Sequence, residues 1–557
     1  MCSVSERMVW RLHQLKLPLD HTPADLQQLV CRRLKLPDGA VQELTIVRRS
    51  VDARRQQAIA LVYSVDVALQ LNAAQRRQLA RRAERDPNLH PSPESQYRLP
   101  QLSSPTGGAS RPVVVGAGPC GYFAALVLAQ MGLRPLLLER GKAIRERTAD
   151  TFAFWRRQRP LDPESNAQFG EGGAGTFSDG KLYSQVSEPA HYQRKVLEEL
   201  VAAGANPEIL THAHPHIGTF KLATVVRGLR GRIEALGGTI RFEARVVDLR
   251  LDDHDRRLEA VQLASGEWIE ATQVVLAPGH SARDVFALLQ RHGVAMEAKP
   301  FAMGVRVEHP QALIDRARWG AAAGHPRLGA AEYKLVHHCQ GEGLAGRSVW
   351  SFCMCPGGLV VGAASEPGGV VTNGMSQHSR NERNANSALV VNIELDDVAP
   401  YGKGHQDPLA GVAFQRHWEA RAYALAGGSY AAPSQSVVSF LQQEPAETDL
   451  VPASYQPGVV DCDLEQTLPT FVTAALREAI PRFERHIAGY AGQGARLTAV
   501  ETRTSSPVRI CRNNTTLECT NTPGLFPAGE GAGYAGGILS AAIDGIKVAE
   551  QVALQLN

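Results

Sequence analysis

Residues 112–140 read PVVVGAGPCGYFAALVLAQMGLRPLLLER, and this stretch decides the fold of the chain's central part. A short apolar strand runs into a G-x-G-x-x-G turn, which is followed by an apolar segment of helical length and a second apolar strand ending at Glu139. The three glycines suit a tight turn, a close approach of the backbone to a pyrophosphate, and tight packing of helix on strand. Free amides at the helix start favour an anion, and a proline is tolerated there. The stretch therefore predicts a dinucleotide-binding unit. Its candidate cofactor-binding residues are Gly116, Gly118, Pro119, Gly121, Glu139, whose carboxylate would accept from ribose hydroxyls, and Arg140.

The glycine letters alone are a weak signal. They recur at 170–175, 341–346 and 531–536, without the full strand, helix, strand and acid. The uncharged run 112–133 is long enough to cross a bilayer, but the turn inside it favours a buried strand and a buried helix. We therefore expect no membrane span.

The C-terminal residues 521–550, NTPGLFPAGEGAGYAGGILSAAIDGIKVAE, favour FAD over NAD as the dinucleotide. They resemble the closing motif of FAD-dependent oxidoreductases, in which an acid after a strand binds the ribityl chain and the next helix points its N-terminus at the flavin. Residues 274–279 resemble the strand by which such chains re-enter the FAD domain, with Pro278-Gly279 in place of the commoner Thr-Gly. The cofactor-binding residues that this resemblance implies are Val246 near the adenine, Gly279, Gly529, Glu530, Gly536, Gly537 and Ile538.

Further segments resemble one family, the bacterial uncharacterised NAD(P)/FAD-dependent oxidoreductases, also called FAD-utilising dehydrogenases. The segments are 166–183 (NAQFGEGGAGTFSDGKLY), 277–284 (APGHSARD), 301–315 (FAMGVRVEHPQALID), 352–362 (FCMCPGGLVVG), 373–384 and 501–510 (ETRTSSPVRI). The resemblance covers nearly all of residues 105–557. It implies a bound FAD and an α/β fold, in which a glutathione-reductase-like FAD-binding Rossmann domain carries an inserted α+β substrate domain. NAD(P)H is a candidate electron donor, and no substrate is implied.

The first hundred residues predict a small separate domain. Strand-like runs alternate with two helical patterns in a β-α-β-β-α unit of ferredoxin-like size, and residues 87–111 have the composition of a linker. The predicted domains are 1–105 (a small ferredoxin-like α+β domain with its linker), 106–300 together with 495–557 (the FAD-binding domain) and 301–494 (the substrate domain).

Composition excludes several classes of protein. The chain has 557 residues, 44% hydrophobic and 21% charged, with a formal net charge of +3, so no global field attracts nucleic acid. Residues 1–100 contain 16 Lys and Arg against 10 Asp and Glu, which makes this end mildly basic. Nine cysteines without a C-x-x-C pair predict neither a disulfide framework nor a metal site. We expect a cytoplasmic protein with a small-molecule substrate and no stable nucleic-acid complex, and the oligomeric state stays open.

Three residues are candidates for the chemistry. Lys181, at the end of a glycine-dense loop that also contributes Gly173 as a cofactor contact, is a candidate for stabilising flavin charge or binding substrate. His280 is a candidate to face the flavin, and Arg509 to bind an acidic substrate or an FAD phosphate. The alternatives are a solvated lysine, a structural histidine and a structural ion pair.

Cys353-Met354-Cys355 is a candidate redox pair, because alternate residues of a strand share a face. Dithiol flavoenzymes of the disulfide-reductase type carry C-x-x-C or C-x4-C beside the FAD loop, and this spacing is missing here. Structural thiols are therefore the alternative interpretation. A second complete fingerprint for NAD(P)H is also absent from the sequence.

These patterns together predict an FAD-dependent oxidoreductase, a dehydrogenase that passes hydride through flavin N5. One alternative is a flavin-dependent RNA-modifying enzyme, which would grip RNA with a basic N-terminal helix. The arginines of that helix are Arg76, Arg77, Arg81, Arg82 and Arg85. A solvated helix face also explains them. The other alternative is a non-catalytic FAD-binding protein.

Overall fold

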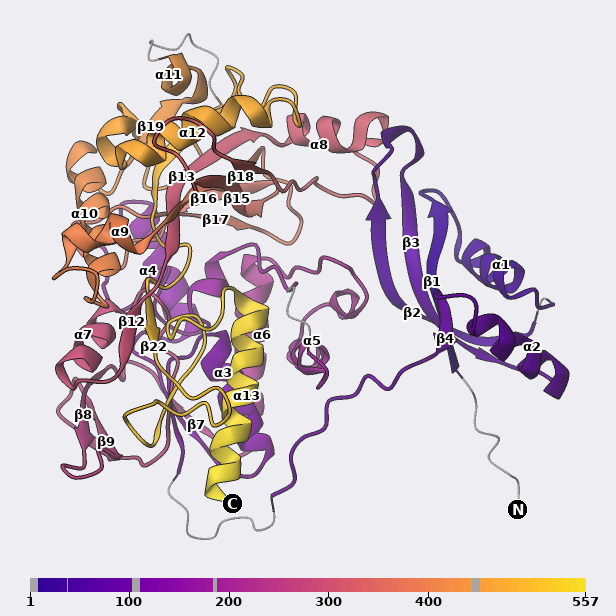
Figure 1. The fold of residues 1–557 in the computed structure, drawn as a ribbon, viewed down its shortest axis with the longest axis horizontal. Helices are drawn as coiled ribbons and strands as arrows, with labels where there is room; N and C mark the ends of the chain where they lie inside the picture. The colour runs from indigo at the N-terminus through magenta and orange to yellow at the C-terminus, as the bar shows by residue number, and fades with distance from the viewer. Residues whose placement is uncertain (1–8, 38, 103–110, 184–187, 443–450) are drawn as a thin grey trace.

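The uncharged run around the glycine turn forms the centre of a mixed α/β fold (Figure 1). The computed structural model describes residues 9–37, 39–102, 111–183, 188–442 and 451–557. β5 (Val113–Val115), α3 (Pro119–Gln130) and β6 (Leu136–Leu138) are buried along almost their whole length, which confirms the predicted buried strand, helix and strand. No helix of the described segments is both long and apolar enough to cross a bilayer.

A five-stranded parallel sheet with the order β23-β11-β5-β6-β7 organises this region. Apolar side chains of α3, α5, α6 and α13 form one cluster on one face of the sheet. A three-stranded sheet, β10-β9-β8, and α7 supply apolar residues to a second cluster, which includes the other side of β5 and β6. The remaining bounds are α4 (Ile144–Trp155), α5 (Tyr192–Ala202), α6 (Thr219–Ala235), β7 (Thr239–Arg241), β8 (Val246–Leu251), β9 (Leu258–Leu263), β10 (Trp268–Glu270), β11 (Val274–Leu276), α7 (Arg283–Arg291), β12 (Met296–Ala298), β22 (Val508–Ile510), β23 (Leu525–Pro527) and α13 (Ile538–Leu556).

A seven-stranded sheet, β14-β15-β18-β13-β21-β19-β20, forms the second large layer. It is mostly antiparallel, and its long central strands β13 and β18 are buried on both faces. The bounds are β13 (Phe301–Pro310), α8 (Gln311–Trp319), β14 (Val336–His338), β15 (Ser348–Cys355), β16 (Gly358–Gly362), β17 (Thr372–Ser376), β18 (Asn384–Ile393), α9 (Leu395–Val398), α10 (Ala410–Leu425), β19 (Ala432–Ser436), α11 (Val437–Gln442), β20 (Val459–Asp461), α12 (Thr470–Phe483) and β21 (Arg496–Glu501).

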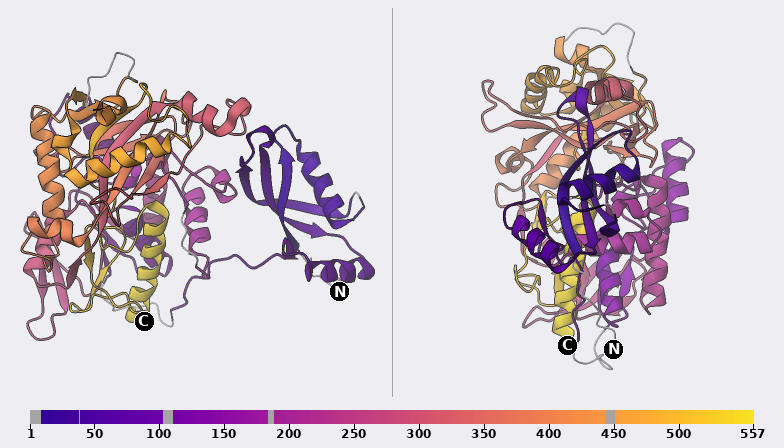
Figure 2. Two further views of the ribbon diagram at one scale, coloured as in Figure 1. Left: turned by 45° about the horizontal axis from the view of Figure 1, so that its top comes forward. Right: turned by 90° about the vertical axis from the view of Figure 1, so that its right-hand side faces the viewer.

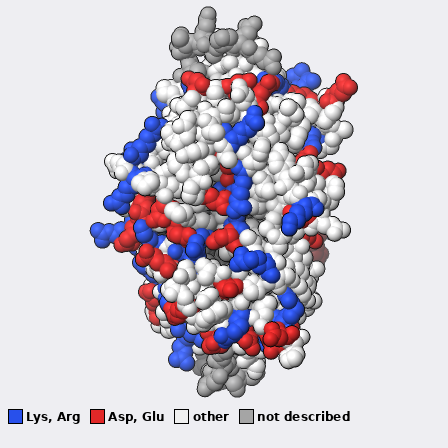
Figure 3. All heavy atoms as spheres, turned by 90° about the vertical axis from the view of Figure 1, so that its left-hand side faces the viewer, with Lys and Arg blue, Asp and Glu red and all other residues white. Residues whose placement is uncertain are grey.

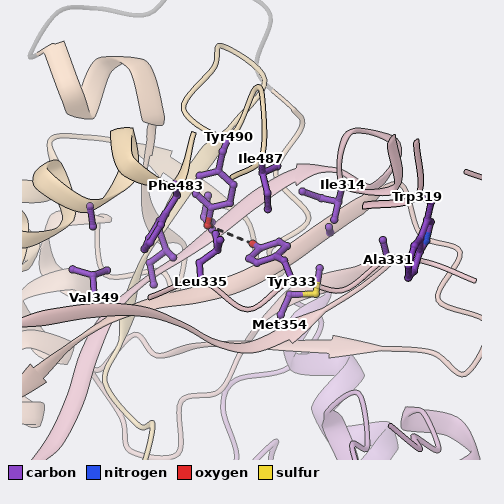
Figure 4. Close-up of a cluster of buried hydrophobic side chains, with 14 of the residues drawn as sticks. Ile314, Trp319, Ala331, Tyr333, Leu335, Val349, Met354, Phe483, Ile487 and Tyr490 are labelled. Atoms are coloured by element: carbon purple, nitrogen blue, oxygen red, sulfur yellow. Dashed lines mark hydrogen bonds between the residues drawn. The ribbon is translucent and has the colours of Figure 1, made fainter. Parts of the chain in front are cut away.

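Helix α12 and the loop after it cover one face of this sheet with apolar and aromatic side chains (Figure 4). Tyr333 and Tyr490 point toward each other, and their hydroxyl oxygens lie 3.5 Å apart. Met354 of β15 points into the same cluster and is 4% exposed. This packing anchors the C-terminal part of β15, which reaches the site described below.

The N-terminal residues form a separate four-stranded antiparallel sheet with the order β2-β3-β1-β4, and two helices connect its strands. It stands beside the main body and is joined to it by an extended segment (Figures 1 and 2). The amide of Arg49 donates to Thr211 O (2.7 Å) and Arg327 Nη1 donates to Leu19 O (2.8 Å), so backbone contacts also hold it. Its elements are β1 (Val9–Pro18), α1 (Pro23–Leu34), β2 (Val41–Asp52), β3 (Ala60–Leu69), α2 (Ala73–Ala83) and β4 (Leu89–Pro91).

Two sequence expectations change at this end of the chain. The predicted linker 87–111 contains a short strand, β4, because a three-residue edge strand can pair with β1 even beside prolines. Residues 103–110 of that linker lie outside the described residues. On the basic helix, Arg82 donates to the carbonyls of Arg33 and Leu34, and Arg76 donates to the carbonyl of Leu71. At least these two arginines therefore bind the protein's own backbone and do not belong to a purely solvated face.

His309, on β13, is a buried histidine that the fold holds in its neutral form. Its Nε2 lies 2.8 Å from the carbonyl of Tyr490 and therefore carries the hydrogen. Its Nδ1 is buried and has no partner in the described part of the chain. Burial lowers the pKa of His309 to about 4, because a protonated ring would carry a second N–H with no acceptor.

We expect this histidine to make the protein acid-sensitive. Its folded pKa lies below its unfolded value, so its contribution to stability is complete above about pH 6.5 and is lost as the pH falls toward 4. At pH 5 the loss amounts to about 2 kcal/mol. Urea unfolding of wild type and His309→Gln at pH 7 and 5 measures it, with the exposed His254→Gln as control. If the free energy of unfolding falls between pH 7 and pH 5 by the same amount in wild type and in His309→Gln, the assignment is wrong.

Candidate functional site

A cavity of about 380 Å³ lies where the parallel sheet meets the seven-stranded sheet. Its walls include the residues that directly follow β5, β6, β11 and β23, which are the carboxyl ends of the parallel strands. Residues 352–353, 373, 501 and 503–505 close it from the side of the second sheet. Ligands of open α/β sheets bind at this end of the strands, so the fold places a ligand site here.

The glycine turn after β5 has the geometry that its spacing predicts. Gly116 has φ 102°, and a Cβ on it would lie 2.2 Å from the carbonyl oxygen of Ala277. A Cβ on Gly121 would lie 1.8 Å from the carbonyl oxygen of Gly116, so this glycine lets α3 pack on β5. A Cβ on Gly118 would meet only Gly173, at 3.8 Å. Gly118 therefore leaves room in the cavity at the N-terminus of α3.

Glu139, after β6, is held by backbone amides at the cavity wall. Its Oε1 accepts from Gly141 (2.9 Å) and Gly170 (3.0 Å), and its Oε2 accepts from Ala117 (2.8 Å). A carboxylate oxygen can accept two hydrogen bonds, so Oε2 has one acceptor position that the described residues do not fill. Glu139 thus offers a fixed acceptor to a ligand.

The glycine-dense loop is anchored by Arg147 of α4, a residue that the sequence motifs do not predict. Its fully buried guanidinium donates to the carbonyls of Glu171 (2.7 Å) and Gly173 (2.9 Å), among others. Burial lowers its pKa to about 10. The amide of Gly172 donates to Ala117 O (2.8 Å), which ties the loop to the glycine turn. No local sequence signal identifies Arg147, because its acceptors are backbone carbonyls 19 to 26 residues away.

The N-terminus of α13 opens into the same cavity through Gly536, Gly537 and Ile538. A Cβ on either glycine would meet no atom within 4 Å. Beside them, Nδ1 of His280 lies 2.9 Å from Oε1 of Glu530, while Nε2 of His280 is buried and has no partner among the described residues. The N-termini of two long helices, α3 and α13, therefore open into one cavity.

Lys181 lies at the opposite end of the glycine loop and lines the cavity. Its Nζ donates to the carbonyl of Met354, with Glu332 at 3.7 Å and Asp179 at 3.9 Å. Burial alone would lower the pKa of Lys181, but these two carboxylates raise it. Lys181 is therefore a charged group of the cavity wall, not the solvated lysine of the alternative interpretation.

The cavity collects most of the candidate residues that the sequence predicts. The candidates that line it are Gly116, Gly118, Pro119, Glu139, Arg140, Gly173, Lys181, Val246, Gly279, His280, Glu530, Gly536, Gly537 and Ile538. Gly121 and Gly529 lie behind it: Gly121 supports α3, and Gly529 has φ 74° and donates its amide to Asp544 (2.7 Å). Their roles toward a ligand stay predictions.

Arg509 is the candidate that the fold places away from the cavity wall. Its Nη1 donates to Oε1 of Glu297 (2.9 Å), and both side chains are half exposed. The strands β22 and β12 carry this pair. Arg509 therefore has the geometry of the structural ion pair. Its position does not support the predicted role in binding a substrate or an FAD phosphate.

Two family models match the chain. Residues 300–504 match the family described as FAD-dependent protein, C-terminal domain-like, and residues 10–68 match a domain of unknown function. An uncharacterised protein of Clostridium beijerinckii is 44% identical over 551 residues, which cover 98% of each chain.

Solved flavoproteins resemble the chain more distantly. A flavoprotein/dehydrogenase from Cytophaga hutchinsonii is 12% identical, with a TM-score of 0.35 and coverage of 80% of this chain and 79% of that one. The flavin-dependent brominase Bmp2, as a triple mutant, is 11% identical, with a TM-score of 0.35 and coverage of 80% of each chain. At these scores the likeness carries no argument about activity.

Proposed function

Because the chain belongs to the family of its Clostridium beijerinckii relative, a family of uncharacterised FAD-dependent oxidoreductase-like proteins, we propose that it is an FAD-dependent oxidoreductase acting on a small molecule. The observation that carries the proposal is the single cavity that joins the glycine turn, Glu139 and the N-terminus of α13. An FAD molecule needs a ribose acceptor, a pyrophosphate site and a flavin site, in this order along its length.

The residues present fit that cofactor. Gly118 leaves space at a helix N-terminus, where free amides and the helix dipole favour a pyrophosphate. Glu139 keeps an acceptor position for a ribose hydroxyl. His280 has a buried ring nitrogen with no partner in the described structure, and that nitrogen would find one in a bound polar ligand. These are unfilled polar positions and open glycine positions of the kind a cofactor would fill.

In this arrangement the chain's residues bind and orient. Glu139 and Val246 would hold the adenosine end, and Gly118 the pyrophosphate. Glu530 would hold the ribityl chain, and the amides of 536–538 the pyrimidine edge. Bound there, FAD would supply two-electron chemistry that amino-acid side chains lack. Lys181 provides a fixed positive charge near a substrate that enters beside the glycine loop.

The charge distribution on one face of the molecule agrees with a small-molecule partner. Figure 3 shows Lys and Arg interspersed with Asp and Glu on one face, without a broad patch of one sign. The net charge of +3 agrees with this distribution. Residues 300–504, which match the FAD-dependent C-terminal family, contribute the cavity wall on the side of the seven-stranded sheet. We assign substrate binding to that wall.

Replacing Glu139 by alanine is expected to weaken FAD binding by at least about tenfold. The variant loses a charge-assisted hydrogen bond to ribose and also the carboxylate that holds the amides of Ala117, Gly141 and Gly170 at the cavity wall. Titration of the apoprotein with FAD, followed by quenching of flavin fluorescence, measures this change. Glu259→Ala, on the half-exposed surface of β9, is the matched control and should bind FAD as wild type does. Equal affinities for the Glu139→Ala variant and wild type would place the adenosine elsewhere.

An anaerobic titration of the purified holoprotein with NADH and with NADPH tests the oxidoreductase assignment. Loss of the visible flavin absorbance with either donor is the expected result and identifies that donor. If dithionite bleaches the flavin but neither nucleotide does, the NAD(P)H link is wrong. A colourless protein that takes up no added FAD would contradict the whole proposal.

A further inference from the structure

The strand β15 is interrupted where it reaches the cavity. It pairs with β18 through Phe352↔Ala388 and then through Cys355↔Asn386, so β15 carries one extra residue in between. Cys353 sits in this bulge and has φ 44°, a left-handed conformation that is costly for a residue with a Cβ. Bulges of this kind redirect a side chain near a site.

The bulge turns Cys353 toward the cavity. Met354 points the other way, into the cluster around Tyr333 (Figure 4). Cys353 lines the cavity wall together with Lys181 and Asn373, whereas Cys355 is fully buried behind it. The thiol of Cys355 lies 3.3 Å from the carbonyl oxygen of Cys353. One thiol therefore faces the cavity and a second lies directly behind it.

Two cations hold the bulge. Nη1 of Arg306, fully buried on β13, donates to the carbonyl of Cys353 (2.9 Å), and Nζ of Lys181 donates to that of Met354. Glu501 pairs with Arg306 through two hydrogen bonds of 2.9 and 2.8 Å. Asp179 and Glu332 face Lys181 from 3.9 and 3.7 Å. The cations are thus fixed beside the cavity thiol.

This environment separates Cys353 from the other thiols. A hydrogen bond from Cys355, and then the charges of Arg306 and Lys181, lower the pKa of Cys353, although its burial and Glu501 oppose them. The thiols whose pKa is raised, chiefly by burial or by donation to Cys353, are those of Cys120, Cys339, Cys355, Cys462 and Cys511. Among these six cysteines Cys353 is the one whose surroundings favour a thiolate, which is the nucleophilic form.

We propose that Cys353 and Cys355 form a dithiol centre that reduces small disulfides entering the cavity. The Cys353 thiolate attacks one sulfur of the disulfide; a new S–S bond forms, the substrate S–S bond breaks, and the leaving thiolate takes a proton from water. Cys355 then loses its proton, and its sulfur attacks Cys353 Sγ and expels the second thiolate, which is protonated in turn. The substrate gains two electrons and two protons as two thiols, and the centre becomes a disulfide. A single turnover needs no cofactor, so the inference stands apart from the proposed function.

Adjacent-but-one cysteines can reach the required geometry. Their Cα atoms lie about 6.6 Å apart in a regular strand, near the upper end of the range for disulfides. The left-handed turn at Cys353 departs from that extended path. The hydrogen bond from the Cys355 thiol that lowers the pKa of Cys353 brings the two thiols beside each other.

The test uses the full chain with Cys2, Cys462 and Cys511 replaced by serine, reacted with the chromogenic disulfide dithiobis(nitrobenzoic acid). We expect two equivalents of released thiolate and no retained adduct. Adding Cys355→Ser should give one equivalent and a stable adduct on Cys353, and adding Cys353→Ser should give none. We call the chain with only Cys2, Cys462 and Cys511 replaced the parent. In the parent, mass spectrometry of the peptide that contains Cys353 and Cys355 should show a disulfide between them and no retained adduct.

Two results would overturn the inference. Equal release from the parent and from Cys353→Ser would show that another thiol reacts. One equivalent with an adduct that persists in the parent would show that Cys355 does not resolve it. FAD content, measured by absorbance on each sample, separates these outcomes from failure of the proposed function. Circular dichroism checks that each variant is folded.

Discussion

Gly118→Ala is expected to lose about a hundredfold in FAD affinity while the protein stays folded, a loss of about 2.7 kcal/mol in binding free energy. The residue has φ −78°, which alanine adopts freely, and a Cβ there would meet only Gly173 at 3.8 Å. The added methyl group would instead occupy the space that a pyrophosphate needs against the first amides of α3. Calorimetric titration of the apoprotein with FAD measures the loss.

Gly121→Ala is the matched control, three residues along the same turn. Its Cβ would lie 1.8 Å from the carbonyl oxygen of Gly116, so α3 must move away from β5 and the fold itself is destabilised. We therefore expect a lower melting temperature for Gly121→Ala and an unchanged one for apo Gly118→Ala. If Gly118→Ala binds FAD as wild type does, the phosphate lies elsewhere in the cavity.

The contrast between these glycines shows which part of the site a sequence can predict. A turn is encoded by neighbouring residues, so the spacing of Gly116, Gly118 and Gly121 predicts both the bend and the open position at the helix start. Glu139 follows from the same unit, because parallel neighbouring strands end at one edge of the sheet. The second helix N-terminus was predicted because the closing motif is also local.

Contacts between distant segments could not be predicted in the same way. Arg147 serves backbone carbonyls, which every residue has, so its partners leave no trace in the sequence. The position of Arg509 depends on the pairing of β22 with β12, which places it beside Glu297 and away from the cavity. The bulge that turns Cys353 into the cavity depends on the register between β15 and β18. The alternation of apolar and polar residues along one strand carries no information about its register with a neighbouring strand.

Another contact between distant segments is centred on Glu419 of α10, which joins the two halves of the cavity. Its carboxylate accepts from Arg283 at 2.7 and 2.8 Å and from Arg503 at 3.2 and 3.1 Å. All three side chains are buried, and Arg503 also donates to Ser281 (3.0 Å) at the cavity wall. Helix α7, which carries Arg283, and α10 are therefore tied through one buried charge.

Glu419→Ala is expected to lower the free energy of unfolding by about 3–5 kcal/mol, because two buried guanidinium groups lose the charge that they share. Glu366 still pairs with Arg283 at 2.8 Å, but it also serves Arg416 and leaves Arg503 uncompensated. Arg416→Ala is the control: this arginine is half exposed and pairs at the surface, so its removal should cost less than about 1 kcal/mol. Urea unfolding of both variants at one fixed FAD concentration compares them, since a bound cofactor adds to stability by mass action. If the free energy of unfolding falls by a similar amount in the two variants, the buried charges do not hold the two halves of the cavity together. The expected difference would make Glu419 the residue on which the shape of the cavity depends.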